Sequence, residues 1–437
     1  MPDLNRFFEL DARGTTVARE LRGAVATFLT MAYILFVNPQ ILAAAGVPKD
    51  SAVACTAAAA GVCCLLMGFY ANFPLALASG MGLNAIVAFT ITKEVGSWQV
   101  AMGLIVLDGL AILLLVLAGL REAVMNAIPR DLRLAIGAGI GLFIAFIGLQ
   151  HAGIVIDHPQ TLVTFGSLRN PATAVASIGV VIAATLVARR VPGALVVSIL
   201  LTTAIVFAWD AMWGGLALLE RWPPRFAAPD FSAAFKADVR GALRLQFVPL
   251  LLSVMMVDFF DTLGTVSAVA EQAKLTDANG RVPGVRRILI VDSISASIGG
   301  LLGASSVTSY VESAAGVAEG ARTGLHTVFV GLFFLLAIFA APLAGIVPAA
   351  ATAPALILVG FLMIAQMANV DFEQLDTAIP AFVILLTIPM TFSISHGIGY
   401  GFLALVLIKL LSGKPRDVHP LMWVTAAAFG AYFVWAR

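Results

Sequence analysis

Apolar runs of roughly 20 residues, the length of helix that crosses the hydrocarbon core of a bilayer, recur along the whole of this chain. Only 12% of its 437 residues are charged and 60% are hydrophobic, whereas about a quarter of the residues of soluble domains are charged. Such a chain has too few polar groups to cover a water-facing surface. The runs therefore predict an all-α polytopic membrane protein in contact with the lipid bilayer.

The apolar runs fall into two sets of seven, joined by a more polar stretch. The first set occupies 24–45, 52–71, 82–92, 99–120, 132–150, 172–189 and 193–213. The second set occupies 247–270, 286–303, 311–320, 325–347, 353–369, 378–394 and 397–412. The sequence thus predicts 14 transmembrane segments in two halves, 1–213 and 247–412, with an amphipathic connection at 214–246. A C-terminal segment, 413–437, holds one more apolar run at 422–435 that could span or lie at the interface.

Each half contains a third segment that is too short, and too rich in glycine or serine, to cross as one helix. The two segments are FPLALASGMGLNAIVAF at 73–89 and GASSVTSYVESAAGVAEG at 303–320. Interrupted segments at matching positions of two halves are typical of the central site of a transporter, and non-helical backbone at membrane depth needs cover from protein or a cavity. We expect extended pieces at 75–80 and 305–310, leading into half-helices near Met81 and Val311. Two re-entrant loops without a ligand are the alternative.

The distribution of lysine and arginine tests the orientation, because cytoplasmic loops carry an excess of these residues. With a cytoplasmic N-terminus and alternating spans, most basic residues of the short loops fall inside. The connection 214–246 is the exception, and long loops cross with less regard to charge. An odd number of spans per half inverts the second half relative to the first, as in inverted-repeat carriers. The sequence predicts a multi-pass protein of the cell (inner) membrane with its N-terminus in the cytoplasm.

Charge balance and short motifs exclude several other classes of function. The net charge of +1 gives no indication of nucleic-acid binding. The sequence contains no Walker-type glycine loop and no H-E-x-x-H motif, which argues against an ATP-driven pump and a metalloprotease. Cys55, Cys63 and Cys64 lie in one apolar stretch and are expected to pack there without a disulfide framework. We expect no cofactor and no metal.

Acidic residues inside the predicted spans are functional candidates by default, because an ionisable group is costly there. Asp258 and Asp261 lie three apart in VMMVDFFDTLGT and share one helical face, so one of the two is expected to hold a proton unless other partners intervene. Glu312 begins the second half-helix, where the helix dipole favours its charge and burial opposes it. Together with Asp292 these acids are candidates for proton coupling, with a structural role as the alternative for Asp258 and Asp292. Asp108 is a weaker fifth candidate.

Neutral polar and aromatic residues near the interrupted segments are candidates for ligand binding. Asn84 could offer an amide to a ligand or bond a neighbouring helix, and Tyr310 could stack on a flat ligand. Thr27 and Thr30 share one face of the first span, although hydroxyls in membrane helices often bond the backbone instead. The DxxD pattern could also serve an intramembrane Mg²⁺-dependent transferase. The absence of a second aspartate-rich motif within a span argues against that enzyme.

Five longer stretches together carry a family resemblance. They are ATFLTMAYILFVNPQIL (26–42), ASGMGLNA (78–85), VDFFDTLGT (257–265), GASSVTSYVESAAGVAEGARTGL (303–325) and IPMTFSISHGIGYGF (388–402). With them the chain resembles the AzgA-like hypoxanthine, guanine and adenine permeases of the nucleobase–ascorbate transporter superfamily. The resemblance implies two inverted repeats, with short antiparallel strands in spans 3 and 10. It also implies a core domain of about 24–120 plus 247–347 and a gate domain of about 132–213 plus 353–412.

The resemblance implies a secondary transporter, not an enzyme, that imports purine nucleobases by proton symport with an elevator-like movement of core against gate. The acids of the family's span-8 and span-10 motifs match Asp261 and Glu312, which would bond the ring edge of the base. The aromatic residue two positions before the second acid matches Tyr310. The span-9 aspartate matches Asp292, a coupling or core-stabilising position. Ser313 replaces the asparagine that usually follows the acid in the wider superfamily, which weakens any transfer of uracil or xanthine selectivity.

Backbone N–H groups complete the predicted purine site. They belong to Ser79 and Gly80 in the first interrupted segment, and to Ser309 through Val311 in the second. A carrier of the same fold for uracil, xanthine or an anion is the alternative. The resemblance leaves a homodimer open.

Overall fold

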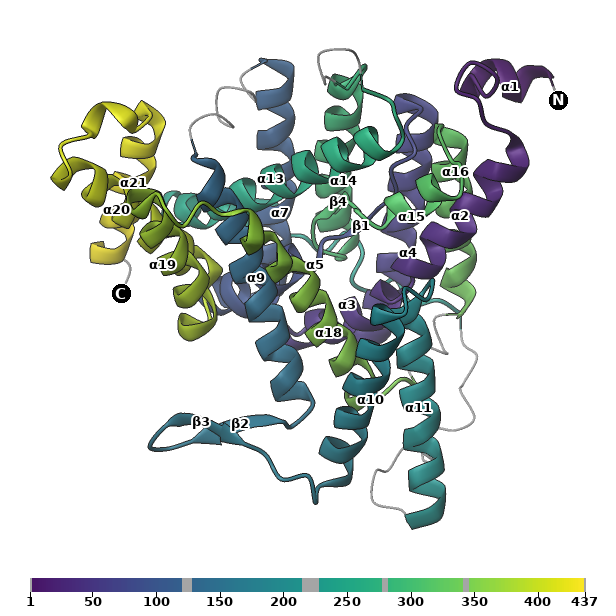
Figure 1. The fold of residues 1–437 in the computed structure, drawn as a ribbon, viewed down its shortest axis with the longest axis horizontal. Coiled ribbons are helices and arrows are strands. Elements are labelled where there is room, and N and C mark those ends of the chain that lie inside the picture. The colour runs from purple at the N-terminus through teal and green to yellow at the C-terminus, as the bar shows by residue number, and fades with distance from the viewer. Residues whose placement is uncertain (1, 120–127, 214–227, 277–281, 341–345, 436–437) are drawn as a thin grey trace.

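The computed structural model describes residues 2–119, 128–213, 228–276, 282–340 and 346–435, and helices make up most of it (Figure 1). Within these residues, eight helical stretches are long and apolar enough to cross a membrane: Val17–Ala44, Lys49–Ala71, Trp98–Leu117, Arg130–His151, Pro171–Ala188, Ala194–Met212, Ala349–Asn369 and Ile394–Leu411. Shorter apolar helices occupy Leu245–Phe259, Gly324–Ala337, Leu375–Thr391 and Pro420–Val434. The prediction of a mostly helical, multi-pass membrane protein is confirmed.

The helices of the first half follow the predicted runs. They are α1 (Pro2–Phe8), α2 (Val17–Met31), α3 (Ile34–Ala44), α4 (Lys49–Leu66), α5 (Met81–Ala85), α6 (Thr92–Val95), α7 (Trp98–Leu117), α9 (Arg130–His151), α10 (Pro171–Ala188) and α11 (Ala194–Trp213), with η1 (Met67–Ala71) after α4 and η2 (Ile86–Ile91) after α5. The helix predicted at 24–45 begins earlier, at Val17, because Thr16 caps it by accepting the N–H of Arg19 at 3.3 Å. A turn at 32–33 then separates α2 from α3.

The second half also follows the predicted runs. Its helices are α12 (Val239–Ala242), α13 (Val248–Gln272), α14 (Val285–Leu302), α15 (Ser313–Ala318), α16 (Gly324–Ala337), α18 (Ala349–Ile364), α19 (Leu375–Thr391), α20 (Ile394–Leu411) and α21 (Pro420–Trp435), with η4 (Leu245–Phe247), η5 (Ile338–Ala340), η6 (Ala365–Asn369) and η7 (Pro415–Asp417). The predicted connection 214–246 lies outside the described residues over 214–227 and then continues as α12 and η4. The apolar run at 422–435 is helix α21, and its Phe433 stacks on Tyr400 of α20 with 4.7 Å between ring centroids.

A β-hairpin between α9 and α10 has no counterpart in the sequence prediction. Its strands, β2 (Val155–His158) and β3 (Leu162–Phe165), pair antiparallel with Val155 opposite Phe165. Figure 1 shows the hairpin extending away from the helices. None of its side chains is fully buried, so neither strand has a buried face. The alternation of apolar and polar residues that marks a half-buried strand is therefore not expected here.

The two interrupted segments meet as a buried strand pair in the middle of the molecule (Figure 1). β1 (Leu77–Ser79) pairs antiparallel with β4 (Val307–Ser309), and all six residues are buried. The predicted extended pieces are therefore confirmed. The half-helix α5 begins at Met81 as predicted, whereas α15 begins at Ser313, two residues later than predicted.

The helices form two packed groups. The first surrounds the strand pair and contains α2, α4, α7, α14 and α16, whereas the second contains α9, α10, α11, α18, α19 and α20. Each group has a crossing at which two glycines bring helix backbones together, Gly61 with Gly331 and Gly141 with Gly360. A Cβ at Gly360 would lie 2.4 Å from the carbonyl oxygen of Gly141. Small residues allow the close crossings typical of membrane helices.

Candidate functional site

The strand pair is closed at both ends by bonds between the two interrupted segments. The N–H of Gly80 donates to the carbonyl of Ser306, and the N–H of Tyr310 donates to the carbonyl of Ala76, both at 2.9 Å. The hydroxyl of Tyr310 also donates to the carbonyl of Ser79 at 2.5 Å. Because these bonds cross between segments, each segment fixes the position of the other.

Ser313, the residue that departs from the superfamily pattern, also holds this crossing. Its hydroxyl donates to the carbonyl of Tyr310 at 2.7 Å and accepts the N–H of Ala76 at 2.9 Å. The side chain is fully buried. A serine at this position therefore supports the strand pair.

Two predicted acids converge on an accessible place beside the crossing. Glu312 lies at the N-cap of α15, is half-buried, and accepts a hydrogen bond from the hydroxyl of Tyr33 at 3.1 Å. Asp261 of α13 is exposed, and the neighbouring Val311 is 54% exposed. Asp261 lies close enough to Glu312 and to Tyr310 for their charges to interact. Two carboxyl groups from different elements thus lie near each other beside the crossing, one exposed and one half-buried.

The other two predicted acids are buried and bonded to hydroxyl groups. Asp292 of α14 accepts hydrogen bonds from Thr262 at 2.6 Å and Ser309 at 2.8 Å. Asp258 accepts one from Ser306 at 2.8 Å. These bonds tie α13 and α14 to β4 and the turn before it, so both acids support the strand pair. Their part in proton coupling stays a prediction.

The first interrupted segment places neutral polar groups beside the same crossing. Asn84 and Ser79 are fully buried, and the Asn84 amide nitrogen lies 3.5 Å from the Ser79 carbonyl. Within the described part of the chain, the Asn84 Oδ1 and the Ser79 hydroxyl have no hydrogen-bond partner. Gly80 packs tightly here, because a Cβ would lie 2.7 Å from the methyl group of Thr308.

The two predicted threonines direct their hydroxyls into the protein. Thr27 accepts the N–H of Gly316 at 3.1 Å, and its hydroxyl lies 2.9 Å from Nε2 of His326. Thr30 donates to the carbonyls of its own helix, at Ala26 and Thr27. The structure therefore places both hydroxyls in bonds that hold helices, and their contact with a ligand stays a prediction.

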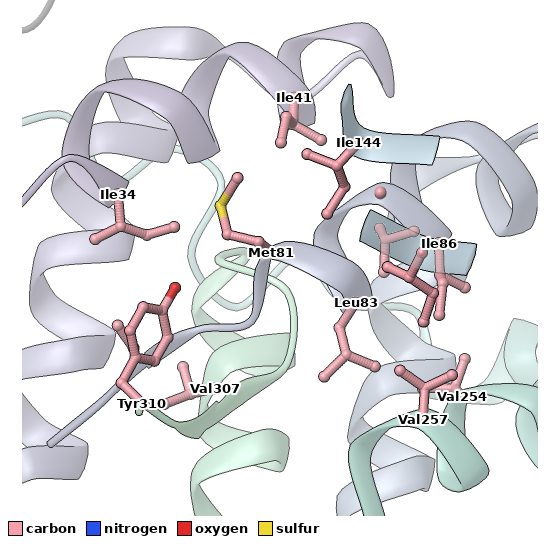
Figure 2. Close-up of a cluster of buried hydrophobic side chains, with 14 of the residues drawn as sticks. Ile34, Ile41, Met81, Leu83, Ile86, Ile144, Val254, Val257, Val307 and Tyr310 are labelled. Carbon is pink, nitrogen blue, oxygen red and sulfur yellow. The ribbon is translucent and has the colours of Figure 1, made fainter. Parts of the chain in front are cut away.

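Several residues beside the site were missed by the sequence reasoning. Tyr33, which bonds Glu312, is 2% exposed and comes from the turn between α2 and α3. Figure 2 shows Ile34, Met81 and Val307 around Tyr310, so apolar side chains line the region of the crossing. The stretch 26–42, one of the five family stretches, contains Tyr33 and was the signal that could have identified it.

The part of the chain that the structure describes holds no group of three or more His, Cys, Asp or Glu residues arranged to bind a metal ion. Broken helices that meet at an acidic site inside a bundle of apolar helices are the architecture of secondary transporters. The fold and the site thus define a transporter-like, multi-pass membrane protein.

Comparison with known proteins identifies the family. A family model described as a permease family, Xan_ur_permease, matches residues 19–399, and the chain belongs to this family. It is 41% identical over 429 residues to the adenine permease AdeQ of Escherichia coli strain K12, covering 98% of this chain and 95% of AdeQ. It is 39% identical over 444 residues to the guanine/hypoxanthine permease PbuG of Bacillus subtilis strain 168, covering 99% of this chain and all of PbuG. The resemblance to the nucleobase–ascorbate transporter superfamily is thereby confirmed.

Solved structures share the fold at low sequence identity. The transmembrane domain of a cyanobacterial bicarbonate transporter, BicA, superposes with a TM-score of 0.61 at 17% identity, covering 88% of this chain and 97% of that domain. At this identity the likeness describes the fold alone.

Proposed function

We propose that this permease imports purine nucleobases, namely hypoxanthine, guanine or adenine, by proton symport across the cell (inner) membrane. The observation that carries the proposal is the convergence of Asp261 and Glu312 on one accessible place beside the strand crossing. Relatives named for adenine transport and for guanine and hypoxanthine transport, 41% and 39% identical over nearly the whole chain, support the choice of substrate. A purine ring carries N–H groups at its edge, and a carboxylate accepts hydrogen bonds from such groups.

In this proposal a flat base lies between the two interrupted segments. Glu312 and Asp261 accept hydrogen bonds from the N–H groups of its ring. Gly80 and Tyr310 already use their own N–H groups within the strand pair. An antiparallel ladder turns alternate N–H groups away from the partner strand, so those of Ser79 and Ser309 are the strand donors left for a ligand. The apolar side chains around Tyr310 in Figure 2 would contact the ring faces.

Proton coupling follows from the charges of the site. Asp261 and Glu312, both ionised and without a ligand, repel each other in a medium of low dielectric. A base whose N–H groups bond both carboxylates, together with a proton taken up by the acids of the site, lowers that repulsion. With one negative charge fewer, the loaded site then crosses the membrane at a lower cost than the empty one.

The transport step in this proposal is an elevator-like movement of a core, about 24–120 plus 247–347, against a gate, about 132–213 plus 353–412. The division of the helices into two packed groups supports it. The topology belongs to the same proposal: fourteen spans in two inverted repeats and a cytoplasmic N-terminus. The loop charges of the sequence support this orientation. A homodimer is left open in this proposal.

Uptake of labelled adenine, guanine and hypoxanthine by cells without their own purine uptake tests the proposal, with and without a protonophore. We expect uptake that the protonophore abolishes and that Glu312→Ala lowers by roughly 10- to 100-fold, because a hydrogen bond to a charged group is lost. Glu319→Ala is the matched control, since Glu319 is an exposed acid at the end of the same helix and pairs with the exposed Arg22 at 3.6 Å. Full uptake by Glu312→Ala would contradict the assigned role. Thermal stabilisation of the purified protein by an anion or uracil, but by no purine, would favour another solute.

A further inference from the structure

A second acidic group lies deeper in the protein, where α7 meets α13. Asp108, in the middle of α7, is 0% exposed, and no N–H or O–H group of the described residues donates to either of its carboxyl oxygens. The group that faces it, within hydrogen-bonding reach, is the carboxyl of Asp258 on α13, which is 1% exposed. Gly109 packs so closely on α14 that a Cβ would lie 2.5 Å from the Ser293 carbonyl oxygen. Two carboxyl groups therefore face each other in a tightly packed interior.

Such a pair needs a proton. A hydrogen bond between two carboxyl groups requires one of them to be protonated, and two buried carboxylates side by side strongly disfavour double ionisation. The charged groups that act on Asp108 are both acidic, Asp258 from α13 and Asp292 from α14. Neither can neutralise it, so a proton shared between the two carboxyl groups is the arrangement that lets them lie side by side in this interior.

The basic residues of the elements packed on α7 lie at its two ends. Lys93 and Glu94 belong to α6, which ends just before α7 begins at Trp98. Arg240 belongs to α12, whose N-cap Asp238 donates its N–H to the Gln99 carbonyl in the first turn of α7. At the other end, Arg286 of α14 donates to the Leu117 carbonyl at 3.4 Å. These cations are thus separated from Asp108, which lies about midway along the helix.

The acid pair is connected to the strand crossing by short contacts. Asp258 accepts a hydrogen bond from the Ser306 hydroxyl at 2.8 Å, and the Ser306 carbonyl accepts the N–H of Gly80 at 2.9 Å. Asp258 also lies one helical turn before Asp261 and interacts with its charge. A change of charge on the pair therefore acts directly on both interrupted segments and on the accessible acid.

We propose that Asp108 and Asp258 form a proton-sharing carboxyl pair that holds the transported proton while Asp261 and Glu312 hold the base. The inference rests on the proposed function, since it assigns the proton of the symport to a site separate from the substrate. In this proposal a proton reaches the pair through the exposed Asp261, one helical turn from Asp258 on α13. The pair thereby alternates between singly protonated and fully protonated forms without any other chemical change.

Asp108→Asn tests this pair, because the amide keeps the shape of the acid and donates to Asp258 but cannot exchange a proton. We expect the variant to exchange labelled for unlabelled purine across proteoliposome membranes at a rate close to that of the unchanged protein. Accumulation driven by a proton gradient should fall by up to roughly 50-fold, the ratio that one proton drives at a typical membrane potential. Its exchange rate should also lose its dependence on pH.

Ser297→Ala is the control, because Ser297 of α14 bonds the Val106 carbonyl in the same helix interface without an acid; it should keep exchange and accumulation. Gradient-driven accumulation by Asp108→Asn equal to that of Ser297→Ala would overturn the proposal, as would equal loss of exchange and accumulation in a folded variant. If the unchanged protein accumulates purine without any need for a gradient, the proposed symport itself fails, which is a separate result.

Infrared spectra supply a measurement independent of transport. The carbonyl bands of protonated carboxylic acids should change in Asp258→Asn and in Asp108→Asn relative to the unchanged protein, and a spectrum identical to that of the unchanged protein in both variants would overturn the pair.

Discussion

The two interrupted segments meet in one strand pair but bring different chemistry to it. The first, β1 with α5, is buried except at the half-buried Gly82, and its polar groups beside the crossing are the neutral Ser79 and Asn84. The second, β4 with the start of α15, carries Glu312 and exposes Val311 by 54%. Segments at matching positions of the two halves have thus separated into a neutral, enclosed side and an acidic, accessible side.

This difference indicates which properties of the site each side controls. The strand pair depends on both segments, because its bonds run between them. Charge and access belong to the second segment, with Asp261 of α13 beside it. Variants that break the strand pair should therefore have the same effect on uptake whichever segment they change. Variants that remove a polar group should have different effects in the two segments.

Proline within either strand should have the largest effect, and the same effect on both sides. Ala78 and Thr308 oppose each other in the pair, and proline lacks the N–H that a paired strand needs. We expect Ala78→Pro and Thr308→Pro to abolish purine uptake and to lower the yield of folded protein in size-exclusion chromatography. Thr308→Val, which keeps the N–H and the shape, is the control. Uptake by either proline variant at the level of this control would show that the strand pair is dispensable.

Removal of the two tyrosine hydroxyls should have an intermediate effect that differs between the sides. Tyr310→Phe leaves the buried Ser79 carbonyl without its hydroxyl donor, at a cost of about 1–3 kcal/mol in the free energy of unfolding. Tyr33→Phe removes the donor to the half-buried Glu312, where water can replace it. We expect the larger fall in Tm for Tyr310→Phe and the larger rise in KM for Tyr33→Phe. The reverse order in thermal unfolding and uptake assays would contradict the proposed division.

Asn84→Ala should have the smallest effect, because it removes a neutral group from the enclosed side. We expect a change of about 2- to 10-fold in KM for a base that the amide contacts, the size of one neutral hydrogen bond. The dependence of uptake on pH should be unchanged. Competition between labelled and unlabelled purines measures both quantities, and a loss of pH dependence would show that the neutral side takes part in proton coupling.

Local sequence was sufficient to predict the two extended pieces, whereas their pairing as antiparallel strands was implied by the family resemblance. Glycine and serine clusters interrupt apolar runs at 73–89 and 303–320, and an interruption of this kind changes the backbone wherever it lies. Asp261 and Glu312 stood out for the same reason, as charged groups in apolar surroundings. The hairpin at 155–165 gave no such signal, because its exposed strands have no buried face.

The partners of the acids could not be predicted from the sequence, because they come from distant elements. Asp108 faces Asp258 across 150 positions of the chain, and the hydroxyls that bond Asp292 come from Thr262 and Ser309. The orientation of Tyr33 toward Glu312 depends on the turn between α2 and α3. Such pairings follow from how helices pack, and hydropathy does not record the packing.

The crossings of Gly61 with Gly331 and of Gly141 with Gly360 will shape which variants of this chain survive selection. All four residues lie in helices without a predicted ligand group, yet a Cβ at any of them would lie within 3.1 Å of the facing carbonyl oxygen. Alanine there has to push two backbones apart, so these positions should tolerate as little substitution as the acids. A survey of natural or laboratory-selected variants would find the four glycines and the acids equally intolerant of substitution. Binding measurements on purified variants would be needed to separate residues that recognise the solute from residues that let the helices assemble.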